Sequence, residues 1–93
     1  MYSVIQTKDF QKSLKKIIKN GLKQNIINEI DQLIRMLQDG KQLDAKYRDH
    51  KLSGDLREHR EFHVRSDLLI VYKIEKSILV LTLVEIGSHS YLF

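Results

Sequence analysis

The chain has 93 residues, of which 42% are hydrophobic and 30% charged, a composition typical of one small soluble domain. It contains no cysteine, which excludes disulfide bonds and thiolate metal sites. No secretory leader and no apolar run long enough for a membrane span are visible, so we expect a cytoplasmic protein with no membrane partner.

Positive charge is concentrated near the N-terminus. The formal net charge is +4, and residues 1–23 alone contain six lysines and one aspartate. A positive segment of this kind suits a polyanion or an acidic protein partner. The alternative interpretation is an ordinary solvated helix face.

Apolar periodicity predicts a strand and two helices in the first half of the chain. Tyr2–Gln6 is a candidate strand, and Lys8–Asn20 has the spacing of an amphipathic helix, with Thr7 as its N-cap and Gly21 as its stop. Leu22–Asp39 repeats the helical spacing. Because the connection is short, we expect an antiparallel helical hairpin whose apolar stripes bury against each other and against a sheet.

Three strands are predicted in the second half. Lys41–Asp55 has no clear period and is expected to be a loop, which at this length is more often functional than idle. Leu56–Val64, Leu68–Ile74 and Ile78–Ile86 are strands with short connections, which predicts an antiparallel meander. The expected fold is therefore one α+β domain over residues 1–93, in the order β-α-α-β-β-β, with an antiparallel sheet packed against the helical hairpin.

Alternation along Leu56–Val64 separates the titratable residues. His63 shares the open face with His59, whereas Arg60 is a cation on the apolar-leaning face, where it either snorkels to the edge or is kept for an anion. On a strand, His59 and His63 lie about 13 Å apart, too far to share one ion. We therefore expect no metal site and no cofactor.

The meander topology brings several of these residues to one edge. The end of its first strand, the start of its second and the end of its third lie together, so His63, Asp67 and His89 can meet, whereas His50 needs the long loop to fold over. Taken singly, each histidine is more often a surface residue and Asp67 a turn residue. Together, imidazoles and a carboxylate suit metal-free acid–base chemistry on RNA, whose 2′-hydroxyl is its own nucleophile.

Four ordered blocks carry a family resemblance: Asp49–Gly54 (DHKLSG), Arg60–His63 (REFH), Asp67–Tyr72 (DLLIVY) and Gly87–Phe93 (GSHSYLF). With them the chain resembles, over essentially its whole length, the YafQ branch of the RelE/ParE toxin superfamily. The resemblance implies a RelE-like fold and a bacterial type II toxin. It also implies an mRNA endoribonuclease that acts in the ribosomal A site and is neutralised by a cognate antitoxin.

The resemblance further implies a catalytic set: His50, His63, Asp67, His89 and Phe93. Either of the first two histidines, with the aspartate, would assist deprotonation of the 2′-hydroxyl. His89 would be the general acid, and Phe93 would stack on a base. His59 lies outside the family pattern.

The RNA-phosphate contacts are expected from Arg60 and from lysines of the first helix, which would face ribosomal RNA: Lys8, Lys12, Lys15, Lys16 and Lys19. Two other readings of the chain stay open. One is a non-catalytic toxin of the ParE type that inhibits DNA gyrase. The other is a basic RNA- or protein-binding module whose histidines are passive.

Overall fold

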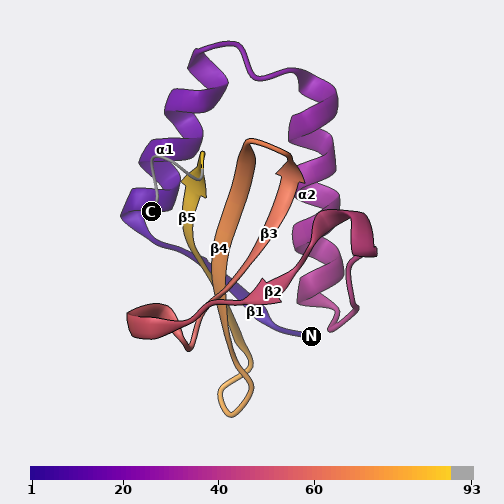
Figure 1. Ribbon diagram of the computed structural model, residues 1–93, viewed down its shortest axis with the longest axis vertical. Helices are drawn as coiled ribbons and strands as arrows, with labels where there is room; N and C mark the ends of the chain where they lie inside the picture. The colour runs from indigo at the N-terminus through magenta and orange to yellow at the C-terminus, as the bar shows by residue number, and fades with distance from the viewer. Residues whose placement is uncertain (89–93) are drawn as a thin grey trace.

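The computed structural model describes residues 1–88 and shows a mixed α+β fold with a sheet and two helices (Figure 1). The helices and strands are β1 (Ser3–Gln6), α1 (Lys8–Lys19), α2 (Gln24–Gln38), β2 (His50–Lys51), β3 (Arg60–Arg65), β4 (Leu68–Glu75) and β5 (Val80–Gly87). Two short 3-10 helices, η1 (Ala45–Tyr47) and η2 (Gly54–Leu56), flank β2. No helix among the described residues is long and apolar enough to cross a membrane.

The two helices begin and end where the sequence predicts, to within two residues. Thr7 Oγ1 accepts a hydrogen bond from the Phe10 backbone N–H at 3.0 Å and donates one to the Val84 carbonyl at 2.6 Å, which fastens the start of α1 to β5. Gly21 takes the left-handed conformation, with φ of 101°, just beyond the end of α1.

The helical hairpin is more open than expected. In Figure 1 the two helices join at the top and lie at opposite margins of the sheet, α1 beside β5 and α2 beside β3. Apolar residues of both helices, among them Phe10 of α1 and Leu33 of α2, belong to one core cluster with residues of the sheet.

The sheet has the strand order β1-β5-β4-β3-β2. The predicted antiparallel meander is confirmed for β3, β4 and β5. The purely antiparallel sheet is wrong, because β1 pairs with β5 in parallel, with Ser3 opposite Val80. A parallel pairing is possible here because α1 and α2 lie between β1 and the later strands and supply the long connection that parallel strands need.

The predicted loop contains a further strand. The two residues of β2 pair antiparallel with β3, His50 opposite Glu61 and Lys51 opposite Arg60. A two-residue strand is too short to leave a periodic pattern, which is why the sequence did not predict it. The following strand begins at Arg60, four residues later than predicted, because Gly54–Leu56 forms η2.

The core defines the two faces of β3. Phe62 and Val64 are buried in the main cluster with Phe10 and with apolar residues of α2, β4 and β5. Because alternate residues of a strand point to opposite faces, Glu61 and His63 project on the other side. The sheet thus presents a polar pair on the face away from its main core.

Candidate active site

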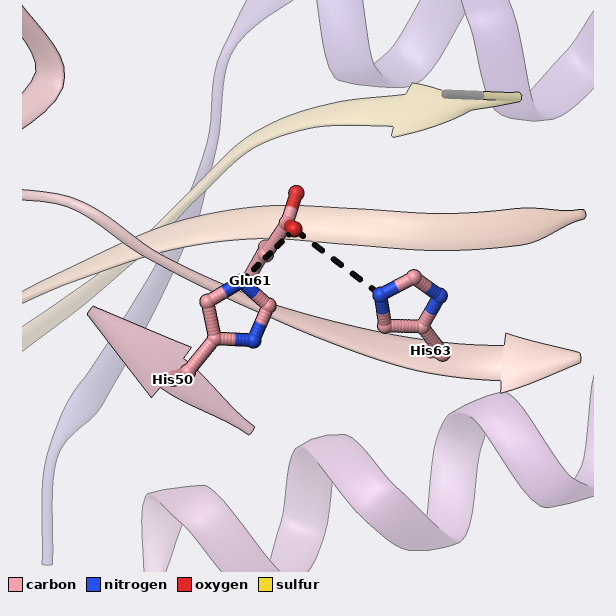
Figure 2. Close-up of side chains that lie close together, drawn as sticks. All are labelled: His50, Glu61 and His63. Carbon is pink, nitrogen blue, oxygen red and sulfur yellow. Dashed lines mark ion pairs between the residues drawn. The ribbon is translucent and has the colours of Figure 1, made fainter. Parts of the chain in front are cut away.

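Two histidines lie around one buried glutamate on this face. Glu61 is only 3% exposed, and its Oε1 lies 2.9 Å from His50 Nε2 and 3.8 Å from His63 Nε2 (Figure 2). The histidine rings are nearly parallel, at an interplanar angle of 22° with centroids 6.1 Å apart. We call these three residues the His–Glu–His cluster. It exists because β2 places His50 directly opposite Glu61.

Only one of the two carboxylate oxygens of Glu61 has a partner among the described residues. Its Oε1 faces both rings, whereas its Oε2 points away from them (Figure 2) and has no hydrogen-bond partner among the described residues. A buried polar atom without a partner is uncommon in proteins, and a catalytic role or a bound ion is one explanation for it.

Arg48 contacts both histidines and sets their hydrogen-bonding roles. Its backbone carbonyl lies 2.6 Å from His50 Nδ1, and a carbonyl only accepts, so that nitrogen carries a proton. Its guanidinium Nη2 lies 3.2 Å from His63 Nδ1, and a guanidinium only donates, so that nitrogen keeps its lone pair. The two rings are therefore chemically distinct.

Arg48 also has an unusual backbone, in the left-handed region with φ of 49°. On its N-terminal side, Tyr47 Oη donates to Glu29 Oε2 at 2.7 Å, and Arg65 donates to the other oxygen of the same carboxylate. The hydrogen bond from Tyr47 is the largest factor that lowers the pKa of Glu29, and the same bond raises the pKa of Tyr47. These contacts tie η1 to α2 and to β3.

On the C-terminal side of Arg48, a second carboxylate holds β2 in place. Both oxygens of Asp49 accept from Tyr72 Oη, at 2.7 and 2.8 Å, and Oδ1 also accepts from Arg60 Nε at 3.2 Å. Burial, and next the hydrogen bond to Asp49, raise the pKa of Tyr72. We call these three residues the Asp49 network.

The Asp49 network includes Arg60, the residue expected to bind phosphate. Arg60 pairs with Tyr72 across β3 and β4, on the opposite face from Glu61. Its guanidinium is thus engaged with Asp49 and lies away from the His–Glu–His cluster.

The remaining predicted residues fall in other places. Asp67 is exposed in the turn before β4 and lines a cavity of about 330 Å³ together with residues of α1, among them Lys16 and Ile17. The lysines expected to face RNA all lie exposed on α1: Lys8, Lys12, Lys15, Lys16 and Lys19. His89 and Phe93 lie outside the described residues. The structure therefore brings His50 and His63 together around Glu61, whereas Asp67 lies beside α1.

Sequence reasoning missed two residues of the site. Glu61 had a signal, because strand alternation puts it on the same face as His63, but its partner His50 comes from a strand that the sequence does not reveal. Arg48 had no signal, because nothing in a sequence predicts a left-handed arginine.

The His–Glu–His cluster also has the composition of a metal site. Each residue offers one ligand atom, and these atoms lie within 4.8 Å of one another. Imidazole nitrogens with a carboxylate oxygen suit zinc, copper or nickel. The spacing argument against a metal concerns His59 and His63 alone, whereas His50 reaches the cluster from a different strand.

Comparisons with known proteins agree on the family. The chain resembles a metal-bound toxin from Helicobacter pylori (40% identity, TM-score 0.88, 100% of both chains covered). It also resembles YafQ in the E. coli DinJ–YafQ complex (26% identity, TM-score 0.86, 100% of this chain and 99% of that one). A comparison with curated protein sequences found no significant match. The family model that describes the bacterial toxin YafQ of a type II toxin–antitoxin system matches residues 2–93, so the chain belongs to the YafQ toxin family.

Proposed function

We propose that this toxin is a ribosome-dependent endoribonuclease that cleaves mRNA by metal-free acid–base catalysis. The observation that carries the proposal is the His–Glu–His cluster, in which a buried carboxylate and Arg48 orient two imidazoles. Imidazoles exchange protons near neutral pH, so they can serve a reaction whose nucleophile, the 2′-hydroxyl, belongs to the RNA itself.

The reaction needs one proton acceptor and one proton donor. The acceptor removes the proton of the 2′-hydroxyl, the 2′-oxygen bonds to phosphorus, and the bond from phosphorus to the 5′-oxygen breaks. The donor then protonates the 5′-oxygen, which leaves a 2′,3′-cyclic phosphate and a 5′-hydroxyl. His50 or His63, with Asp67, assists the first transfer, and His89 supplies the second proton.

Other residues bind the RNA in this proposal. Phe93 stacks on a base of the message. The exposed lysines of α1 contact ribosomal RNA through its phosphates, which fits the sequence-independent character of such contacts. Arg60 contributes to phosphate binding from the face of β3 opposite the His–Glu–His cluster, where its guanidinium also pairs with Asp49.

We also propose that a cognate antitoxin neutralises this chain. The support is the complex of the E. coli relative with DinJ, in which a chain of the same fold is bound. The excess of lysine in residues 1–23 suits an acidic segment of such a partner.

The test is cleavage of a defined message by the purified toxin, with and without ribosomes, mapped by primer extension. We expect cuts within codons at the A site that disappear in His63→Ala, whereas His59→Ala, outside the cluster, cleaves normally. Relaxation of supercoiled DNA by gyrase is measured in parallel. Inhibition of gyrase with no mRNA cleavage would replace the nuclease with a ParE-like binding toxin.

Metal binding is a second candidate function, favoured by the ligand geometry and by the unpartnered Oε2 of Glu61. Two relatives from Helicobacter pylori, at 34% and 40% identity, are described as copper-bound and metal-bound toxins. His50 has its Nδ1 proton held by a carbonyl, an orientation common among metal ligands. Bound copper or zinc would occupy the lone pairs needed for proton transfer and so act as an inhibitor.

Equilibrium dialysis against copper and zinc tests this candidate. We expect one bound ion in the wild type and a large loss of binding in His50→Ala, with His59→Ala as the matched control. Equal binding by all three proteins would show that the cluster is not the metal site.

A further inference from the structure

We propose that a basic groove on the core side of the sheet binds phosphates of ribosomal RNA, as a contact separate from the His–Glu–His cluster and from the lysines of α1. The inference rests on the proposed function, because it takes the ribosome as the site of action. The groove has a volume of about 790 Å³ and lies beyond the end of α2, between that helix end, β2, β3 and β4. We call it the α2–β4 groove.

The α2–β4 groove is lined by five basic side chains and only two carboxylates. The basic residues come from five separate segments of the chain: Lys41, Lys51, Arg57, Arg60 and Lys76. All of them except Arg60 are exposed and make no ion pair within residues 1–88. Cations that converge without counter-ions create a positive potential, which attracts a polyanion.

The two carboxylates of the groove are already engaged. Both oxygens of Asp49 accept hydrogen bonds from Tyr72, and one of them also pairs with Arg60. Glu58 pairs with Lys73, which lies outside the groove, at 3.7 Å. An anion that enters the groove therefore meets four cations whose charge no carboxylate of the described chain compensates.

The apolar lining of the groove separates two possible occupants, a nucleic acid and an acidic amphipathic helix. Such a helix is held by apolar side chains that insert into a hydrophobic groove. Here Leu37 and Tyr72 are only 4% and 1% exposed, and Tyr2 and Ile74 are half-buried. The exposed groups of the groove are instead amines and a guanidinium, which bind phosphates without regard to sequence. The lining thus favours an RNA backbone.

The position of the groove indicates ribosomal RNA as the source of these phosphates. Arg60 and Tyr72 project to the core side of the sheet, whereas Glu61 of the His–Glu–His cluster projects to the other side. A message cut at the cluster therefore lies on the opposite face from the groove. The lysines of α1 are also distant, because α1 lies at the other margin of the sheet (Figure 1) and adds no described residue to the groove. Ribosomal RNA would then contact the toxin on two sides.

Ribosome binding by a double variant tests the groove without any cleavage. The probe is purified bacterial ribosomes programmed with a message whose A-site codon has 2′-deoxy sugars, which removes the nucleophile. We expect Lys41→Gln/Arg57→Gln to weaken binding about 10-fold and to lower the slope of log Kd against log salt concentration by about 1–2, because two phosphate contacts are lost. Lys76→Gln should have about half this effect on the slope. Arg35→Gln/Lys46→Gln is the matched control, since it removes the same charge from exposed residues outside the groove.

Ribosomes without a message identify the source of the phosphates. The loss in the double variant should be equal on vacant and programmed ribosomes, and a loss confined to programmed ribosomes would make the groove a message site and overturn the inference. Unchanged ribosome binding by the double variant would also overturn it, and weaker binding of polyglutamate in that case would assign the groove to an acidic protein segment.

Cleavage of the unmodified message separates this inference from the proposed nuclease. A wild type that binds ribosomes through the groove but does not cleave would remove the nuclease and leave the groove. A wild type that cleaves, with a double variant that binds ribosomes as tightly as the control, would remove the groove and leave the nuclease. A wild type that does not bind ribosomes would overturn the inference whether or not it cleaves free RNA.

Discussion

Two carboxylates, that of the half-buried Asp49 and that of the buried Glu61, lie on opposite faces of the same sheet edge and differ in how many of their oxygens have hydrogen-bond partners. Both Asp49 oxygens accept hydrogen bonds, from Tyr72 and Arg60. Glu61 uses only Oε1, and its Oε2 has no partner within residues 1–88. The first arrangement rigidifies its surroundings, whereas the second leaves a buried oxygen for which a catalytic role or a bound ion is one explanation.

The two carboxylates nevertheless depend on each other. Asp49 immediately precedes His50, so its bonds to Tyr72 fix the position from which His50 reaches Glu61. The Asp49 network, on the core side of the sheet, thus holds in place one residue of the His–Glu–His cluster on the opposite side. The predictions below separate the two roles by asking whether a change affects cleavage, stability or both.

The largest effect is expected for Glu61→Gln. The amide keeps the shape of the side chain but removes the charge that orients His50, so single-turnover cleavage should fall about 10²- to 10⁴-fold. The free energy of unfolding should change little, because the substitution removes a buried charge of which one oxygen has no hydrogen-bond partner. Glu58→Gln, on an exposed residue paired with Lys73, is the control. Normal cleavage by Glu61→Gln would remove the cluster from the mechanism.

Asp49→Ala should affect stability first. It leaves the buried hydroxyl of Tyr72 and the guanidinium of Arg60 without their partner, which costs about 1–3 kcal/mol in the free energy of unfolding. Urea denaturation measures this loss, and Asp55→Ala, on an exposed residue, serves as control. Cleavage should also decline because β2 loses its anchor. A stable variant with displaced His50 resonances would show that anchoring and stability are separate.

Tyr72→Phe should cost about 1 kcal/mol and change the response to alkali. The pKa of Tyr72 is raised in the folded protein, so the unfolded chain ionises first and wild-type stability falls as pH rises above about 10. The variant should lose that part of the fall, while the contribution of Tyr47, of the same sign, remains. Thermal unfolding between neutral and strongly alkaline pH gives the comparison. If the wild type and Tyr72→Phe lose stability equally as the pH rises, the raised pKa of Tyr72 does not contribute to that loss.

The smallest effect contrasts two left-handed residues. Leu79, with φ of 54° in the exposed turn between β4 and β5, and Arg48 both carry backbone strain. Glycine at either position should raise stability by about 1 kcal/mol, which a shift in Tm detects. Only Arg48→Gly should lose cleavage. Loss of cleavage in Leu79→Gly as well would mean that backbone strain itself, and not the Arg48 side chain, matters to the site.

Much of the fold is readable without a structure. The helices follow from apolar residues at helical spacing and from local signals such as the Thr7 cap and Gly21, which act within a few residues. The meander strands follow from alternation and short turns. The parallel pairing of β1 with β5 is not readable in this way, because strand direction depends on the crossover through both helices.

For the site, too, local sequence signals predict one part and long-range contacts decide the other. The sequence by itself predicted candidate residues and the family: His50, His63 and Asp67 stand in motifs that resemble a toxin family, and the match over residues 2–93 shows that family. Only the tertiary structure decided that Glu61 is buried between two imidazoles and that Arg48 sets their hydrogen bonds. The physical reason is that a two-residue strand and a left-handed arginine are held by long-range contacts, which no local pattern encodes.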